Sequence, residues 1–195
     1  MNLTFSGELL DGRANLTLDY TVQPGGRIEV DLQFQANEQL PQLIRLGTEW
    51  ELPREFHNIR WYGRGPDPTY ADRKFEPIGI FASTVMENWM DHAKPQENSN
   101  KVDVRWLEVT NDDGHGLRVM SNVALSVNAQ PFRKSEIAGK AYSWQLPKPS
   151  VTVLNVDLAQ LGVGGDDSWG AIAHPPYRLT DRQYRYVYII EPIVP

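Results

Sequence analysis

Two neighbouring stretches decide the fold class: Ala14-Asn-Leu-Thr-Leu-Asp-Tyr-Thr-Val22 and Arg27-Ile-Glu-Val-Asp-Leu-Gln-Phe34. In both, apolar residues occupy the even positions, which gives a β-strand one apolar and one polar face. The intervening Pro24-Gly25-Gly26 has the composition of a tight turn. The pair therefore predicts an antiparallel hairpin.

The same alternation continues outward along the chain and predicts four more strands, at residues 102–110, 117–127, 151–158 and 183–190. Asn111-Asp112-Asp113-Gly114 reads as a plain turn, because the oxygen-ligand spacing of a calcium loop is missing. Helical composition is confined to residues 132–141, where Gly139 weakens it. Short strands with 15 Gly and 14 Pro predict an all-β antiparallel sandwich, and residues 1–195 read as one domain.

Composition excludes several functional classes. The 195 residues contain no Cys, which removes disulfides, thiolate metal sites and Cys nucleophiles. The net charge of −6 disfavours nucleic acid or an anionic membrane surface as partner. No apolar run is long enough to span a membrane, and residues 1–11 do not read as an export signal. We therefore expect a cytoplasmic protein, or a periplasmic one if the full-length protein carries a signal elsewhere.

No residue pattern identifies a catalytic centre within this chain. The four histidines, His57, His92, His115 and His174, stand far apart and lack metal-motif spacing, so they are expected on loops or the surface. There is no Gly-x-Ser-x-Gly elbow. The 25 acidic residues could supply a glycosidase pair, but nothing singles out an acid and a nucleophile. We predict no catalytic residue and no metal ligand here.

The most unusual stretch is Leu161-Gly-Val-Gly-Gly-Asp-Asp-Ser-Trp-Gly170. Its glycines allow the backbone to take positive φ or to approach a ligand closely. Adjacent carboxylates at Asp166 and Asp167 argue against a phosphate cradle, and they offer few of the six to eight oxygens that calcium takes. Two interpretations remain open: the loop presents Trp169 to a planar, partly polar ligand such as a sugar ring, or it buries Trp169 in the core.

Two further stretches have the composition of polar recognition loops: residues 61–73, rich in aromatics, charges and turn residues, and residues 94–100, which concentrate amide and carboxylate groups before a strand. Both could equally be structural loops whose side chains bond their own backbones.

Motifs within these stretches carry a resemblance. They are Gly63-Arg-Gly-Pro66, Tyr70-Ala-Asp-Arg73, Pro95-Gln-Glu-Asn98, Asp103-Val-Arg-Trp106 and Gly162-Val-Gly-Gly-Asp-Asp-Ser-Trp-Gly170. In this order and at these separations they resemble the C-terminal domain of the large bacterial β-galactosidases of glycoside hydrolase family 2, over most of the chain.

The resemblance implies a fold, a partner and site residues. The fold would be an antiparallel β-supersandwich of the galactose-mutarotase-like type. It would close one side of a β-galactoside site on a TIM barrel elsewhere, where the catalytic glutamates and the Mg and Na ions of the full enzyme are bound. The partner would be that remainder of the enzyme; homo-oligomer formation is left open.

The resemblance also implies roles for particular residues. Trp169 would form an aromatic wall against the sugar, and Asp167 and Ser168 would bind the substrate beside it. A mobile active-site loop would comprise Gly63, Arg64, Gly65, Pro66, Asp67 and Tyr70, with Gly65 as its pivot.

Three departures from the family pattern bear on these roles. Pro68 and Thr69 replace the usual Glu and Asn before Tyr70, Ser99 stands where Gly is usual, and Lys101 where Arg is common. Two other functional classes therefore stay open beside the β-galactosidase domain. One is a stand-alone carbohydrate-binding module, and the other is an aldose mutarotase, which would need a His and a Glu in one cleft.

Overall fold

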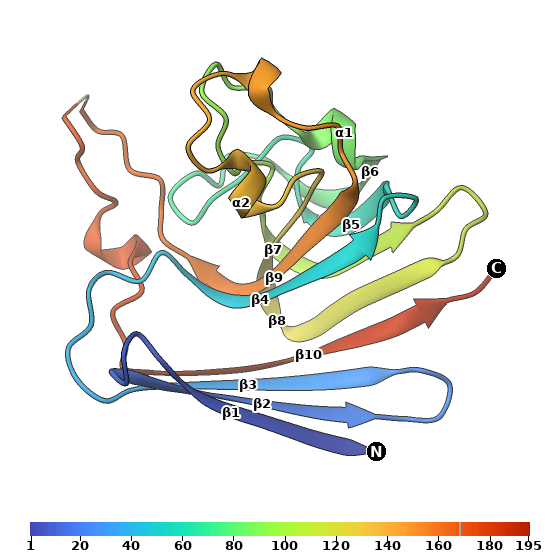
Figure 1. Ribbon diagram of the computed structural model, residues 1–195, viewed down its shortest axis with the longest axis horizontal. Helices are drawn as coiled ribbons and strands as arrows, with labels where there is room; N and C mark the ends of the chain where they lie inside the picture. Colours follow the sequence, from blue (N-terminus) through green and yellow to red (C-terminus); the bar gives the residue numbers. More distant parts are fainter. Residues whose placement is uncertain (168) are drawn as a thin grey trace.

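The computed structural model describes residues 1–167 and 169–195 and is built almost wholly of antiparallel strands (Figure 1). Within the described residues the elements are β1 (Asn2–Leu9), β2 (Ala14–Val22), β3 (Ile28–Ala36), β4 (Arg45–Pro53), β5 (Asn58–Arg64), β6 (Ile78–Thr84), α1 (Val85–Asn88), β7 (Lys101–Thr110), β8 (Gly116–Gln130), α2 (Lys134–Ile137), η1 (Ser143–Gln145), β9 (Val151–Gln160), η2 (Pro175–Tyr177) and β10 (Gln183–Ile193).

The strands form one connected sheet that folds back on itself. Its main path runs β1-β2-β3-β10-β8-β7-β5-β6, and β4 joins through β9, which pairs with β8. The long strand β8 makes the fold-back, since residues 116–120 pair with β10 and residues 126–130 pair with β9. Figure 1 shows the layer of β1, β2, β3 and β10 lying beneath β4 and β9.

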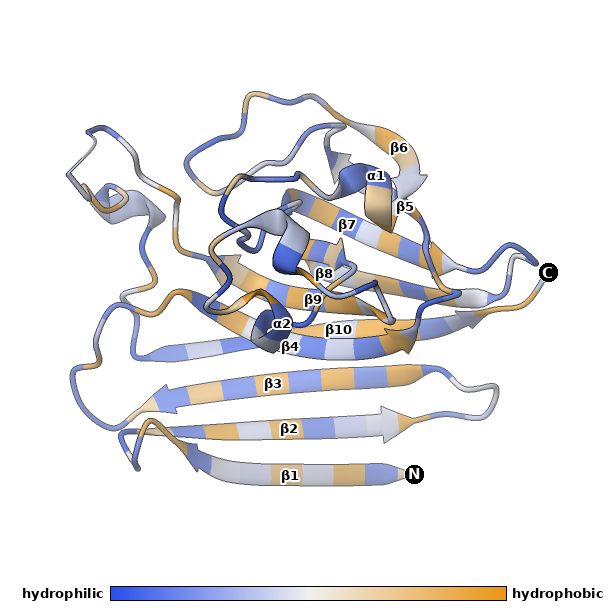
Figure 2. Ribbon diagram, turned by 45° about the horizontal axis from the view of Figure 1, so that its top comes forward, coloured by the Kyte–Doolittle hydropathy of each residue, from blue (hydrophilic) through white to orange (hydrophobic). Residues whose placement is uncertain are grey.

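The core lies between these two layers. Val30, Leu32 and Phe34 of β3 are buried, as the alternation predicts, and apolar and polar residues alternate along the strands in Figure 2. Polar tips of core aromatics find partners across the layers: Trp50 Nε1 donates to Tyr188 Oη over 3.0 Å. The predicted hairpin is thus confirmed as β2 and β3, paired antiparallel with the apolar face inward.

The outer face of β8 and β9 is polar although it is buried. Asn128, Asn155 and Asp157 are 1–2% exposed there. Figure 1 shows α1, α2 and their connecting loops lying over this face. Buried polar groups of this kind need hydrogen-bond partners, and the covering loops supply part of them.

Sequence reasoning found six of the strands and missed β1, β4, β5 and β6. The helical composition of residues 132–141 yields only the four-residue α2, and Gly139, at φ +75°, lies just beyond it. In the part of the chain that the structure describes, no helix has the length and apolar character needed to cross a membrane.

Candidate functional site

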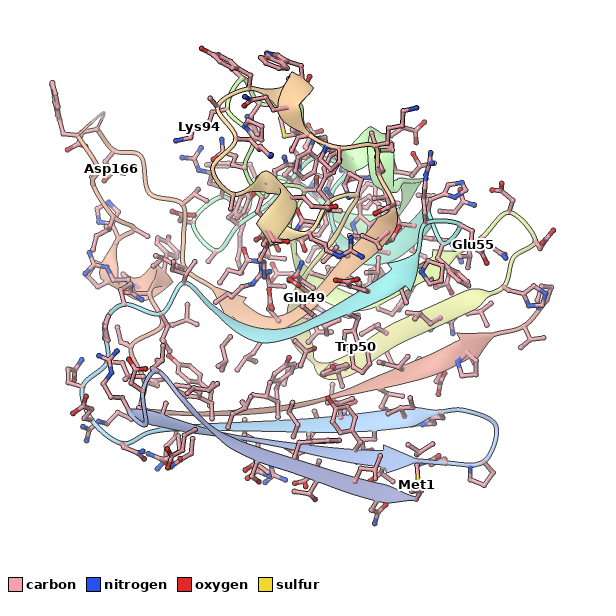
Figure 3. All side chains as sticks on the ribbon, viewed as in Figure 1. Met1, Glu49, Trp50, Glu55, Lys94 and Asp166 are labelled. Carbon is pink, nitrogen blue, oxygen red and sulfur yellow. The ribbon has the colours of Figure 1, made fainter. Side chains whose placement is uncertain are left out.

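The glycine-rich segment forms an outlying loop between β9 and η2. Figure 3 shows Asp166 near the far end of this loop, away from both layers. Trp169 is 92% exposed. The interpretation in which the loop buries this indole in the core is therefore wrong, and the ring is free to contact a ligand. Ser168 lies outside the described residues.

The two carboxylates of the loop bond within it. Asp167 Oδ1 accepts hydrogen bonds from the backbone N–H groups of Trp169, at 2.8 Å, and of Ala171, at 3.1 Å. Asp166 Oδ2 lies 2.5 Å from His174 Nε2. Among the described residues, no three His, Asp or Glu side chains gather closely enough to hold a metal ion. Both carboxylates therefore hold groups of the loop itself.

Glycine is required in this loop for close packing. A Cβ on Gly162 would lie 2.7 Å from Asp72 Cγ, and one on Gly164 would lie 2.6 Å from the carbonyl oxygen of Ala171. Gly164 and Gly165 also have positive φ, +63° and +95°. The predicted positive φ is confirmed, and the close neighbours of these glycines are residues 70–73 and the returning arm of the loop. Close approach to a ligand stays a prediction.

The Tyr70-Ala-Asp-Arg73 motif contacts this loop directly. Asp72 Oδ1 accepts a hydrogen bond from Val163 N at 3.0 Å, and Asp72 Oδ2 accepts one from Gly164 N at 2.8 Å. Arg73 Nη2 donates to the Gly164 carbonyl over 2.7 Å. Two motifs about 90 residues apart therefore meet at one short piece of backbone.

The segment assigned to a mobile loop begins as regular structure. Gly63 and Arg64 belong to strand β5, so the prediction that the loop starts at Gly63 is wrong. Arg64 donates through Nε to Asp103 Oδ2 at 2.6 Å and through Nη1 to the carbonyl of Glu76 at 2.8 Å. Cross-strand pairing extended β5 where composition indicated irregular backbone.

Gly65 is required by packing. A Cβ there would lie 2.8 Å from the Trp61 ring and 2.9 Å from the Phe81 ring, and the residue is buried. Pro66, Asp67 and Tyr70 follow it and line a pocket of about 570 Å³. Motion of residues 65–70 stays a prediction.

Thr69 joins residues 61–73 to residues 94–100. It is 1% exposed. Its N–H donates to Asn100 O at 2.8 Å, Asn100 Nδ2 donates to Thr69 O at 2.9 Å, and Val102 N donates to Thr69 Oγ1 at 3.0 Å. Ser99, beside Asn100, has φ +68°, a backbone conformation that favours glycine. These bonds tie the two segments together, and their role in ligand recognition stays a prediction.

The three motif segments converge on a pocket of about 240 Å³. It is lined by Tyr70 from the first, by Glu97, Asn98 and Asn100 from the second, by Gly162 and Val163 from the third, and by Ile44, Arg45, Asn128, Gln160 and Leu161. The wall therefore combines carboxamides, a carboxylate and a guanidinium with the stem of the Trp169 loop.

An ion cluster that sequence reasoning missed holds this pocket together. Arg45 bonds both Asp157 and Glu97. Burial raises the pKa of Asp157 above its ordinary value, and the Arg45 guanidinium opposes that shift. Asn128 donates to Glu97 Oε1 over 3.1 Å. The available signal was the presence of polar residues within otherwise apolar strands, at Asn128 and Asp157.

Lys101 is a buried cation beside residues 61–73. It is 4% exposed, its Nζ donates to Asn88 Oδ1 over 2.8 Å, and that nitrogen lies 5.2 Å from the centre of the Trp61 ring. Burial lowers the pKa of Lys101 to about 8, although Asp67 and Glu76 oppose the shift. An arginine would stay charged at this position, whereas the lysine is titratable.

The histidines lie where expected. His57, His92, His115 and His174 all fall outside helices and strands, and none is buried. His57 Nε2 lies 3.2 Å from Asp112 Oδ1. All four therefore lie in loops, as the sequence predicts.

Comparisons with known proteins agree with the resemblance. The family model described as "Beta galactosidase small chain" matches residues 2–190. β-Galactosidase BgaC of Bifidobacterium adolescentis is 36% identical over 92% of this chain, and the β-galactosidase of Priestia megaterium is 32% identical over 92%. That of Lactobacillus delbrueckii is 33% identical over 93%. This chain spans about 18% of the length of each of these relatives.

A solved structure shows the same fold. A protein of Escherichia coli K12 named as an aldose 1-epimerase matches 98% of this chain and 65% of its own, with a TM-score of 0.50 and 10% identity. At that identity the likeness concerns the fold alone. It confirms the predicted all-β, antiparallel, galactose-mutarotase-like fold. From the family model and the relatives together, the chain belongs to the β-galactosidase small-chain family.

Proposed function

We propose that this chain is the part of a larger β-galactosidase that completes the sugar-binding site, and that Trp169 supplies an aromatic wall to it. The catalytic carboxylates, and the metal ions of the complete enzyme, would belong to a TIM barrel on other polypeptide. The observation that carries the proposal is the 92% exposure of Trp169, in a chain of this family, on a loop whose stem is hydrogen-bonded.

Indole chemistry suits a sugar ring. The flat apolar face of Trp covers the C–H face of a pyranose, while the hydroxyls stay free for polar partners. Covering half of the ring, about 100 Å², is worth about 2.5 kcal/mol at about 25 cal/mol per Å². That corresponds to a change of about 60-fold in affinity, which a kinetic measurement resolves easily.

The neighbours of Trp169 take supporting roles under this proposal. Asp167 fixes the backbone of Trp169 and Ala171 through two amide hydrogen bonds, so it determines the direction in which the indole leaves the loop. Ser168, next to it in sequence, stays a predicted sugar contact.

The test is the kinetics of Trp169 variants in the complete enzyme. Trp169→Ala is expected to raise KM for an aryl β-galactoside by 10- to 100-fold, because ground-state stacking is lost, and Trp169→Phe should recover part of that loss. Trp144→Ala is the matched control, since Trp144 is 77% exposed on η1. An unchanged KM in Trp169→Ala contradicts the proposal.

The isolated 195-residue chain gives a second test. It should not hydrolyse an aryl β-galactoside, and robust hydrolysis by the purified chain would place the catalytic carboxylates here. Millimolar or tighter galactose binding by the lone chain, followed by Trp fluorescence, would favour the stand-alone binding module. Interconversion of α- and β-galactose, followed by polarimetry, would favour the mutarotase.

A further inference from the structure

We infer that Asp72 and Arg73 are positioning residues for Trp169: they clamp the stem of the glycine-rich loop to the sheet and so hold the indole where a sugar can meet it. The inference rests on the proposed function of Trp169. Neither residue is singled out by composition, and their role follows from which backbone groups they contact.

The clamp starts from a rigid base. Residues 70–73 form a tight turn closed at both ends, with Tyr70 N donating to Arg73 O at 3.2 Å and Arg73 N donating to Tyr70 O at 2.9 Å. The preceding Thr69 is buried and hydrogen-bonded to Asn100 and to Val102 of β7. The Asp72 carboxylate therefore has a fixed position relative to strand β7.

The clamp then binds the backbone of two adjacent residues, Val163 and Gly164. Both oxygens of Asp72 accept backbone N–H groups, from Val163 and Gly164, and Arg73 binds the carbonyl of Gly164. Hydrogen bonds to a charged acceptor or from a charged donor are shorter and stronger than neutral ones. Three such bonds within two residues fix the direction in which the chain enters the loop.

The packing at this point leaves little room for a side chain on the glycines. A Cβ on Gly162 would meet Asp72 Cγ at 2.7 Å, and one on Gly165 would meet Arg73 Nη2 at 3.1 Å. On its other side, Gly162 N donates to Tyr177 O over 2.9 Å. The glycines and the Asp-Arg pair are thus complementary parts of one contact.

Trp169 stands five residues beyond the clamped Gly164, outside any helix or strand. A loop whose stem is loose lets the indole sample many directions, and sugar binding must then order it at an entropic cost. Loss of the clamp should therefore weaken binding without altering the reacting groups. We expect it to raise KM and to leave kcat nearly unchanged.

The experiment compares Asp72→Asn with Asp113→Asn in the complete enzyme. Asn keeps the size of Asp72 but replaces one acceptor oxygen by an NH₂ donor that would face a backbone N–H. Asp113 is an exposed acid in the turn at residues 111–114 and serves as the control. Hydrogen exchange of the Val163 and Gly164 amides should become at least 10-fold faster in Asp72→Asn alone, and KM for an aryl β-galactoside should rise 3- to 30-fold.

A double variant separates positioning from general damage. If Asp72 acts through Trp169, then Asp72→Asn added to Trp169→Ala should raise KM no further, because the indole is already gone. Additive increases in KM, or unchanged exchange at Val163 and Gly164, overturn the inference. So does faster exchange with an unchanged KM in Asp72→Asn while Trp169→Ala raises KM. An unchanged KM in Trp169→Ala sinks the proposed function instead, and the positioning role with it, whatever the exchange shows.

Discussion

Residues 63–73 and residues 162–173 each combine glycines with two aspartates and one aromatic residue, yet the structure holds them differently. The first begins in strand β5 and is tied to β7 by the buried Thr69. The second leaves the body of the protein and exposes Trp169 at 92%. The difference shows that glycine content predicts irregular or closely packed backbone, while a few polar contacts decide whether that backbone is fixed.

Among the substitutions that test this difference, one at Arg64 should lower the stability of the fold the most. Arg64→Met removes the partly buried ion pair with Asp103 and two hydrogen bonds to backbone carbonyls. We expect the free energy of unfolding to fall by about 3 kcal/mol, measured by urea denaturation of the chain. Arg185→Met is the control, because Arg185 is 65% exposed in its pair with Asp31 and should cost under about 1 kcal/mol. Equal losses would mean that the first segment is no better anchored than the surface.

Lys101 gives the next effect, as a dependence on pH. Its pKa is about 8 in the folded chain, against about 10.4 when exposed in the unfolded chain. Between these values the unfolded chain binds more protons, so the free energy of unfolding should rise with pH, by about 2 kcal/mol from pH 8 to pH 10.

The measurement is the difference between this chain and Lys101→Met across that range. The pH range of the measurement should end at pH 10. Burial raises the pKa values of Tyr186 and Tyr188, so above that pH these side chains ionise in the unfolded chain first, which lowers the free energy of unfolding. Parallel stability curves for the two proteins would show that the Lys101 ammonium is not buried in solution.

Thr69 should have a smaller effect. Thr69→Val keeps the shape of the side chain but removes the acceptor of the Val102 N–H, which is then left buried and unpaired. A loss of about 1.5 kcal/mol is expected, again by urea denaturation. Thr21→Val, on β2, should change stability by less than about 0.5 kcal/mol. If Thr69→Val is equally silent, the link between the first segment and β7 is weaker than the geometry indicates.

The smallest stability effect belongs to Trp169. Trp169→Ala should shift the melting temperature hardly at all, within about 0.5 kcal/mol in stability, because the indole buries little surface in the fold. A substantial loss of stability would mean that the ring packs against the protein in solution, and would remove the contrast between the two segments.

Local patterns predicted the regular parts of the fold. The alternation in β2, β3, β7, β8, β9 and β10 and the turn at residues 111–114 were enough to place them. β1 and β4 also alternate, as at Leu3 and Phe5 or Trp50 and Leu52, but were not recognised. β5 was hidden because Gly63 and Pro66 make its end look like a loop.

The site was predictable only in pieces. Glycine composition indicated positive φ or close approach to a ligand; positive φ is confirmed at Gly164 and Gly165, and Gly162 and Gly164 pack closely against other parts of the chain. The contact of Asp72 with Val163 could not be predicted, because it joins residues 91 apart and depends on how distant strands pair. The same reason hid the Arg45 cluster, whose partners come from β9 and from the loop before β7.

The environment of the Trp169 ring during sugar binding tests the central claim most directly. The complete enzyme, labelled with 5-fluorotryptophan, would be titrated with galactose and followed by ¹⁹F NMR, with the resonance assigned from Trp169→Phe. The account predicts that the Trp169 signal shifts and saturates with galactose while the Trp144 signal stays in place. A Trp169 signal that does not move while galactose inhibits the enzyme to saturation would contradict it.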